Sequence, residues 1–129
     1  MKDMDLFKVS DDEALERVKR DGMELRLIEH QTPEICMAAV KQDGYALRFV
    51  KEQTRELCLA AIQKDGWSLQ YVKEQSPEIC MAAVKRNGHA LQFVKEQTPE
   101  LCLVAVRQNS DALKFVRNKT PEIRLAAKR

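Results

Sequence analysis

The stretch that decides the fold is TPEICMAAVKQDGYALRFVKEQ, residues 32–53. From residue 10 to residue 129 the chain repeats this stretch every 22 residues. Copies begin at Ser10, Thr32, Thr54, Ser76 and Thr98, and a half copy begins at Thr120. Self-similarity at a fixed period of this size is typical of solenoid proteins, in which each unit stacks on its neighbours.

Each unit begins with the signals of a short α-helix. Thr32 suits the N-cap, where its hydroxyl can accept a hydrogen bond from an unpaired backbone N–H. Pro33 suits the first helical position, and the carboxylate of Glu34 complements the positive end of the helix dipole. The run 35–40 is apolar around the whole helix circumference, so we expect other elements to cover most of this helix.

A turn follows the first helix at Asp43-Gly44. Glycine suits a left-handed residue at a helix end, which is the conformation we expect for Gly44. The fifth unit has Asn109-Ser110 at this place. A second interpretation therefore stays open, in which Asn109 takes the left-handed conformation and Ser110 caps the next helix.

The second half of the unit predicts another short helix. On an α-helical wheel its apolar residues form an ordinary buried stripe, made of Ala46, Leu47, Phe49 and Val50. Links of only one to three residues favour antiparallel packing of the two helices. The sequence therefore predicts an all-α protein, an α-solenoid of five helix-turn-helix units and a terminal half unit. The alternative is a single long helix on a lipid surface, as in apolipoproteins. It would place a proline or a glycine, or both, inside each period, which costs about 3 kcal/mol per proline and about 1 kcal/mol per glycine in helix stability.

The predicted organisation is a leader followed by one domain. Residues 1–9 form the leader, and the units span residues 10–31, 32–53, 54–75, 76–97, 98–119 and, as a half unit, 120–129. Leu6, Phe7 and Val9 of the leader are expected to pack over the open end of the first unit.

The first unit carries polar residues such as Glu13 and Glu16 where the other units are apolar, which is typical of a terminal capping repeat. Its second helix is expected to turn Leu25, Leu27 and Ile28 inward.

Composition argues against several classes of protein. The chain is 44% hydrophobic and 33% charged, with a net charge of +2, so no strong attraction to nucleic acid or to membranes is expected. Residues 1–10 lack the continuous apolar segment of a signal peptide, and no run approaches the roughly 18 apolar residues of a membrane span. The sequence therefore predicts a cytoplasmic protein without a membrane partner.

The units TPEICMAAVKQDGYALRFVKEQ and SPEICMAAVKRNGHALQFVKEQ, residues 32–53 and 76–97, resemble a family of short two-helix repeats that is catalogued as a domain of unknown function. Such repeats occur in microbes, protists and large viruses. The resemblance covers residues 10–129 and implies helical repeats. It implies no activity and adds no site residues.

No arrangement of residues in the sequence indicates catalysis or a cofactor. The cysteines occur once per unit, without the C-x-x-C spacing of zinc sites, at Cys36, Cys58, Cys80 and Cys102. We expect four buried, unpaired thiols and no bound metal. His30 and His89 have no neighbouring triad partners, and each glycine stands alone, so no phosphate-binding loop is present. A non-enzymatic protein without cofactors is therefore expected.

Two rows of charge repeat with the units. The basic row comprises Lys51, Lys73, Lys95 and Arg117, and the acidic row beside it comprises Glu52, Glu74 and Glu96. Adjacent rows of opposite sign usually form a solvated face on which the charges pair with each other. A functional basic groove is the alternative.

One position varies in every unit while its neighbours barely change, namely Met23, Tyr45, Trp67, His89 and Asp111. Its companions three residues further on are Arg48, Gln70, Gln92 and Lys114. Either this position drifts under weak packing constraint, or the residues form a recognition ladder with one variable side chain per repeat. The expected function is a scaffold that binds a protein or peptide along an extended surface. The alternatives are a purely structural module, or binding of single-stranded nucleic acid with bases stacked on the aromatic ladder residues.

Overall fold

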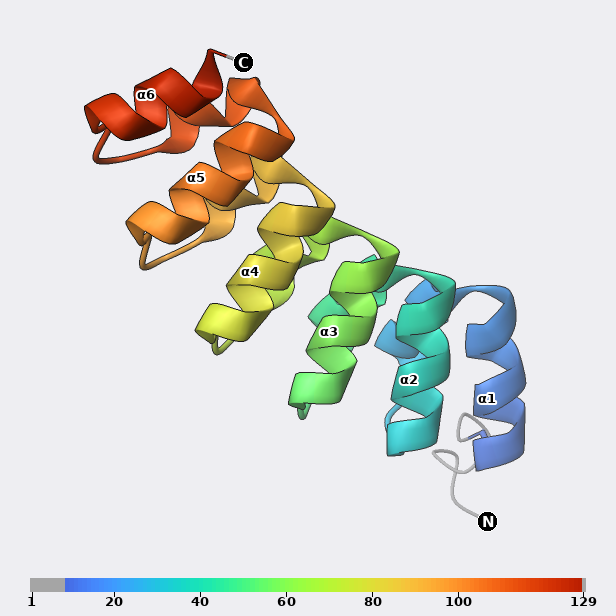
Figure 1. Cartoon of the computed structure of the whole chain (residues 1–129). Coiled ribbons are helices and arrows are strands. Elements are labelled where there is room, and N and C mark those ends of the chain that lie inside the picture. Colours follow the sequence, from blue (N-terminus) through green and yellow to red (C-terminus); the bar gives the residue numbers. More distant parts are fainter. Residues whose placement is uncertain (1–8, 129) are drawn as a thin grey trace.

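A computed structural model describes residues 9–128 and confirms the helical solenoid (Figure 1). Each of the first five units contains a ten-residue α-helix followed by a six-residue 3₁₀-helix, and no strand occurs within the described residues. The elements are α1 (Asp11–Arg20), η2 (Gly22–Leu27), α2 (Pro33–Gln42), η3 (Gly44–Phe49), α3 (Arg55–Lys64), η4 (Gly66–Tyr71), α4 (Pro77–Arg86), η5 (Gly88–Phe93), α5 (Pro99–Gln108), η6 (Ser110–Phe115) and α6 (Pro121–Ala127).

The predicted N-caps of the α-helices are confirmed. The Thr32 hydroxyl accepts a hydrogen bond from the N–H of Ile35 at 3.1 Å, and the same contact recurs at the start of every α-helix from α1 to α6. Thr54 still caps its helix, although Arg55 follows it, whereas a proline follows the cap residue in the next three units. The hydroxyl of the cap is therefore sufficient to start the helix at this place.

The second helix of each unit is a 3₁₀-helix, so the prediction of an α-helix there is wrong. The Asp43 carboxylate accepts a hydrogen bond from the N–H of Tyr45 at 3.0 Å and begins the helix, while Val50 already has extended dihedral angles. Only six residues lie between these two extended positions. Segments this short commonly adopt 3₁₀ geometry, which closes its first hydrogen-bonded turn with fewer residues.

The glycines at the turns are not left-handed, because no described residue has a positive φ. The second interpretation is wrong as well, since Asn109 is extended and its side chain, not that of Ser110, caps η6 by accepting from the N–H of Asp111. Glycine is needed for space: a Cβ at Gly44 would lie 2.6 Å from the carbonyl oxygen of Ala61 in the next unit. Ser110 is accommodated at the last turn, where its side chain is exposed.

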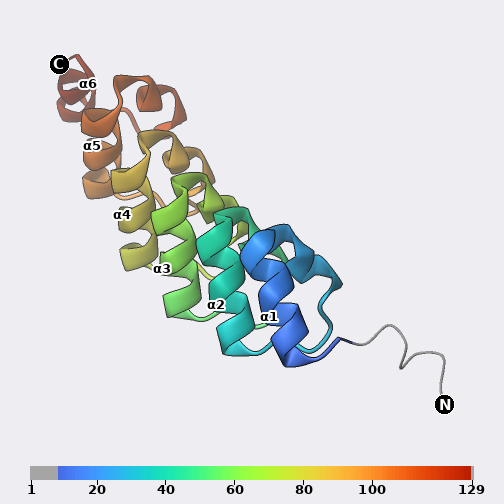
Figure 2. The same cartoon turned by 90° about the vertical axis from the view of Figure 1, so that its right-hand side faces the viewer.

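The helices form two layers, with the α-helices in one and the 3₁₀-helices in the other (Figure 2). Among the described residues, every contact between elements joins the same unit or adjacent units. Within α2, the inward residues Ile35, Cys36, Ala39 and Val40 are buried. They meet the buried side chains of the 3₁₀ layer, so the core is a strip repeated unit by unit. No helix among residues 9–128 is long and apolar enough to cross a membrane.

The first unit departs from one further expectation, because Leu27 is 55% exposed and does not face inward. The equivalent Tyr71 packs against Tyr45 of the preceding unit. No unit precedes Leu27 among the described residues, so its side chain lacks such a neighbour. Leu6 and Phe7, which were expected to cover this end, lie outside the described residues, whereas Val9 is half-buried against the core.

Candidate functional site

A glutamine at the end of each of the first four units ties adjacent units together. The Nε2 of Gln53 donates to the carbonyl oxygen of Tyr71 at 2.8 Å, and its Oε1 accepts from the N–H of Lys73 at 3.0 Å. The same pair of bonds is made by Gln31, Gln75 and Gln97. Each glutamine therefore holds the segment that follows the next 3₁₀-helix, and we call this set the glutamine row.

The cysteines lie beneath the glutamine row. The S–H of Cys58 donates to Oε1 of Gln53, with 3.6 Å between sulfur and oxygen, and the other three cysteines make the equivalent contact at 3.4–3.5 Å. All four thiols are buried and unpaired, which confirms the expectation from the sequence. Burial raises the pKa of each thiol above its ordinary value. The cysteines therefore serve as small core residues with one polar contact each.

The basic row does not pair with the acidic row, so the predicted mutual pairing is wrong within residues 9–128. Lys51 instead donates from Nζ to the carbonyl oxygen of Glu29 at 2.8 Å. Arg117 donates to the carbonyl oxygens of Lys95 and Val94 at 2.8 and 2.9 Å. Lys51 and Arg117 thus satisfy backbone groups of the preceding unit, and no ion pair joins the two rows in the described chain.

A row of four cavities runs along the edge formed by the N-termini of the α-helices. Their volumes are about 560, 590, 410 and 150 Å³ in chain order. The second cavity is lined by Gln53 at the end of the second unit, by Thr54, Cys58, Lys73 and Glu74 of the third unit, and by Glu78 of the fourth. The linings of the others follow from it by shifts of 22 residues, apart from a few substitutions. We call this set the cavity row.

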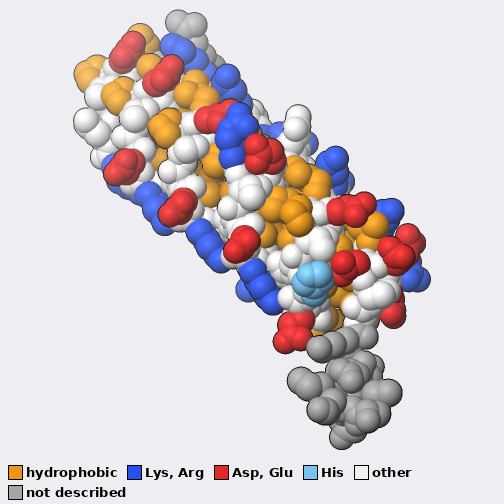
Figure 3. All heavy atoms as spheres, turned by 90° about the horizontal axis from the view of Figure 1, so that it is seen from below, with side chains coloured by type: hydrophobic (Ala, Val, Ile, Leu, Met, Phe, Trp, Pro, Cys, Tyr) orange, Lys and Arg blue, Asp and Glu red, His pale blue; other side chains and the backbone are white. Residues whose placement is uncertain are grey.

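Figure 3 looks onto this edge and shows Lys/Arg and Asp/Glu side chains alternating along one rim, with hydrophobic side chains between that rim and the opposite one. In the lining of the second cavity, Arg55 forms an ion pair with Glu78 of the next unit, with nitrogen–oxygen distances of 2.7 and 2.5 Å. The pairing raises the pKa of Arg55 and lowers the pKa of Glu78, although both side chains stay exposed to solvent. Arg55 thus occupies the first position of α3, which is proline in four other units. Its charge is already balanced by Glu78.

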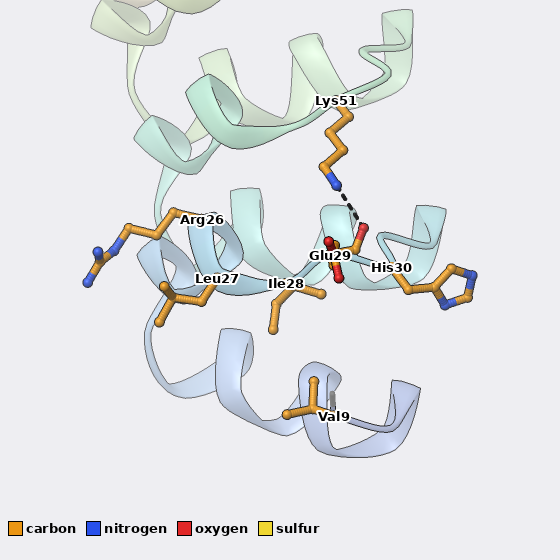
Figure 4. Close-up of a pocket in the computed structure, with 7 residues that line it drawn as sticks. All are labelled: Val9, Arg26, Leu27, Ile28, Glu29, His30 and Lys51. Carbon is orange, nitrogen blue, oxygen red and sulfur yellow. Dashed lines mark hydrogen bonds between the residues drawn. The ribbon is translucent and has the colours of Figure 1, made fainter. Parts of the chain in front are cut away.

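A fifth cavity of about 800 Å³ lies at the N-terminal end and is drawn in Figure 4. Val9 and Ile28 point toward each other across it, while Arg26 and His30 point outward on opposite sides. Glu29, His30 and Lys51 line this cavity and also the first cavity of the row. The hollow edge therefore continues past the first unit boundary.

The ladder residues take part in packing between units. Tyr45 packs on Tyr71 with 5.7 Å between ring centroids, and Trp67 packs on Phe93 at 5.5 Å. His89 repeats this contact with Phe115 at 5.8 Å. These three ladder residues and Met23 are half-buried, whereas Asp111 is exposed. Burial, together with the carboxylate of Asp65, raises the pKa of the Tyr45 hydroxyl.

The companions of the ladder lie on the same face. The guanidinium of Arg48 stands 5.3 Å from the centroid of the Tyr71 ring, and the Lys114 amine stands 5.3 Å from that of Phe115. Gln70 and Gln92 donate to the carbonyl oxygens of Trp67 and His89 in their own helices. Arg48 and Lys114 therefore contact aromatic rings, whereas Gln70 and Gln92 bond only within their own helices. The role of the ladder and its companions in recognition stays a prediction.

A family model described as "Domain of unknown function (DUF4116)" matches residues 54–98 and again residues 76–120. Together the two matches cover more than half of the chain. The chain belongs to this family. Each match runs from one N-cap to the N-cap two units later, so one DUF4116 domain corresponds to two stacked units. No curated protein and no solved structure matches the chain.

Sequence reasoning missed the glutamine row and the cavity row of this DUF4116 chain. The available signal was a glutamine at the same place in four consecutive units, replaced by Lys119 in the fifth. Its role depends on stacking, because the backbone groups that it binds lie 18 and 20 residues further along the chain. Only the two-layer arrangement brings those groups within hydrogen-bond distance.

Proposed function

We propose that the chain is a non-catalytic scaffold that holds an extended segment of another protein in the cavity row. The observation that carries this proposal is the repetition of one cavity along a single edge, lined by equivalent residues at each unit boundary. Helical-repeat proteins use such extended surfaces for binding, since every unit presents the same side chains in the same orientation. The cytoplasm suits this role, because four unpaired thiols persist in a reducing compartment.

The charges of the edge support a peptide over a nucleic acid. The linings of the first three cavities carry seven glutamates against four cations, and this excess of carboxylates repels a phosphate backbone. Single-stranded nucleic acid stacked on Tyr45, Trp67 and His89 is the alternative. These rings already contact the next unit's aromatic side chains, which leaves less ring surface for bases. A purely structural module would need no ligand at either surface.

The proposal can be tested by selecting binders from a random peptide display library on the whole chain. Selected peptides should lose about tenfold or more in affinity when Glu74→Arg and Glu96→Arg reverse two charges of the cavity row. They should bind normally to a chain with Gln70→Ala, which alters the exposed 3₁₀ face. Peptides that depend on Gln70 and ignore both glutamates would contradict the proposal. A short single-stranded RNA that binds with a steep salt dependence, where no peptide does, would favour the nucleic-acid alternative.

A further inference from the structure

The repeat distance of the cavity row restricts the conformation of a bound chain, and this reasoning rests on the proposed function. Neighbouring α-helices pack about 8–10 Å apart, so cavities at successive unit boundaries are separated by about that distance. An extended polypeptide advances about 3.1–3.3 Å per residue, and three residues therefore span one unit. The row thus selects every third side chain of a bound segment.

A segment in polyproline II conformation meets this requirement, whereas a β-strand does not. Polyproline II has three residues per turn, so every third side chain points in the same direction. Successive side chains of a β-strand alternate between two faces, and residues three apart point to opposite faces. A polyproline II segment can therefore place one side chain in each of several consecutive cavities.

The charge of the preferred side chain follows from the net charge of the cavity linings. Glu52, Glu74 and Glu96 each line one of the first three cavities, and none forms an ion pair among residues 9–128. Lys51, Lys73 and Lys95 line the same three cavities, and Lys51 binds a backbone carbonyl. Together the three linings carry seven glutamates against four cations, so their net charge is negative. The charge of Arg55 is balanced by Glu78.

We infer that the cavity row binds a cationic polyproline II segment with Lys or Arg at every third residue. The match extends over three cavities, because Asn118 replaces the glutamate at the fourth. The preferred segment therefore carries three cationic side chains in register with Glu52, Glu74 and Glu96. Arginine fits this role well, since its planar guanidinium can donate two parallel hydrogen bonds to one carboxylate.

The test compares two labelled peptides of identical composition by fluorescence anisotropy. One consists of three Arg-Pro-Pro triplets, and the other has its three arginines adjacent, followed by the prolines. The triplet peptide should bind the whole chain about tenfold more tightly than the clustered peptide. Equal affinities for the two peptides would overturn the inference.

A triple variant tests whether the acidic row discriminates between peptides by the spacing of their arginines. Glu52→Gln, Glu74→Gln and Glu96→Gln together should lower the affinity for the triplet peptide to that for the clustered peptide. The matched control, Asp12→Asn with Glu13→Gln and Glu16→Gln on α1, changes the net charge equally. It should keep the difference in affinity between the triplet and clustered peptides. If the control loses it too, the effect is one of overall charge and the inference fails.

The display selection separates this inference from the proposed function. Selected peptides that bind the cavity row without cationic residues at every third position would overturn the inference and leave the proposed function standing. Peptides that bind no part of the cavity row would overturn both. Circular dichroism of each variant verifies that the helical fold is retained.

Discussion

Ser68 of the third unit has a buried hydroxyl whose hydrogen bonding is unsatisfied. Its hydroxyl is fully buried and has no hydrogen-bond partner among the described residues. The other 3₁₀-helices of units two to five have alanine at this place, namely Ala46, Ala90 and Ala112, and each is fully buried. The environment of Ser68 therefore accepts a methyl group without rearrangement.

Replacing Ser68 with alanine should raise the free energy of unfolding by about 1 kcal/mol, because a buried hydroxyl without a partner is destabilising by about 1–3 kcal/mol. Urea denaturation followed by circular dichroism measures the change. Ser110→Ala removes an exposed hydroxyl and should alter stability much less. A loss of stability in Ser68→Ala would show that the hydroxyl has a partner.

Gly88→Ala should destabilise the chain by about 1–3 kcal/mol, the usual range for overpacking a close contact. A Cβ at Gly88 would lie 2.5 Å from the carbonyl oxygen of Ala105, so α5 must shift to admit it. Thermal melting of the variant beside Ser110→Ala, where a Cβ already exists, measures this cost. Equal melting temperatures would mean that the units separate easily at this boundary.

Trp67 reports on the ladder face separately from the cavity row. It is the only tryptophan and packs against Phe93 and His89, with an interplanar angle of 26° to the His89 ring. The triplet peptide should bind without changing its emission, because no described cavity of the row includes Trp67 in its lining. A blue shift on binding would place the peptide on the ladder instead.

At the scale of the element, the glutamine row decides how firmly two units are joined. Gln75→Ala removes a donor from the carbonyl of Phe93 and an acceptor from the N–H of Lys95. The variant should lose about 1–3 kcal/mol of stability, since backbone groups are left without partners. Gln70→Ala is the control, because Gln70 is exposed and bonds only within its own helix. Equal unfolding midpoints in urea would contradict a joining role for Gln75.

The α-helices could be predicted from the sequence because their signals are local. The Thr32 cap, Pro33 and Glu34 act within one turn, and the structure starts α2 at Pro33. The sequence predicts the wrong type for the second helix because its apolar residues fit either helical period. What selects 3₁₀ geometry is the cap from Asp43 and the return to an extended backbone at Val50.

The site was less predictable because it depends on distances between units. The acidic and basic rows are visible in the sequence, but pairing between them was the natural expectation for adjacent charges. The structure directs Lys51 to a carbonyl of the preceding unit, which no local pattern encodes. The left-handed conformation predicted for Gly44 is wrong for the same reason, since the carbonyl that excludes a side chain belongs to the next unit.

At the scale of the whole molecule, the rates at which the four thiols are labelled report how the units open. Raised pKa values and burial should make labelling by a thiol reagent slow at neutral pH. Single-cysteine variants should label fastest at Cys102, near one end of the described array, and most slowly at Cys58 and Cys80. End units of a solenoid open more easily, because they have fewer neighbours. Equal rates at all positions would indicate that the array opens as one cooperative unit.

The neighbour-only packing also has a mechanical consequence. Tension applied to the two ends would pass through every unit boundary in series, and each boundary of the glutamine row resists with the same pair of hydrogen bonds. Each unit that opened would release 22 residues, or roughly 70–80 Å of extended chain. Under such a load the array would lengthen stepwise and would shorten again as the units restack.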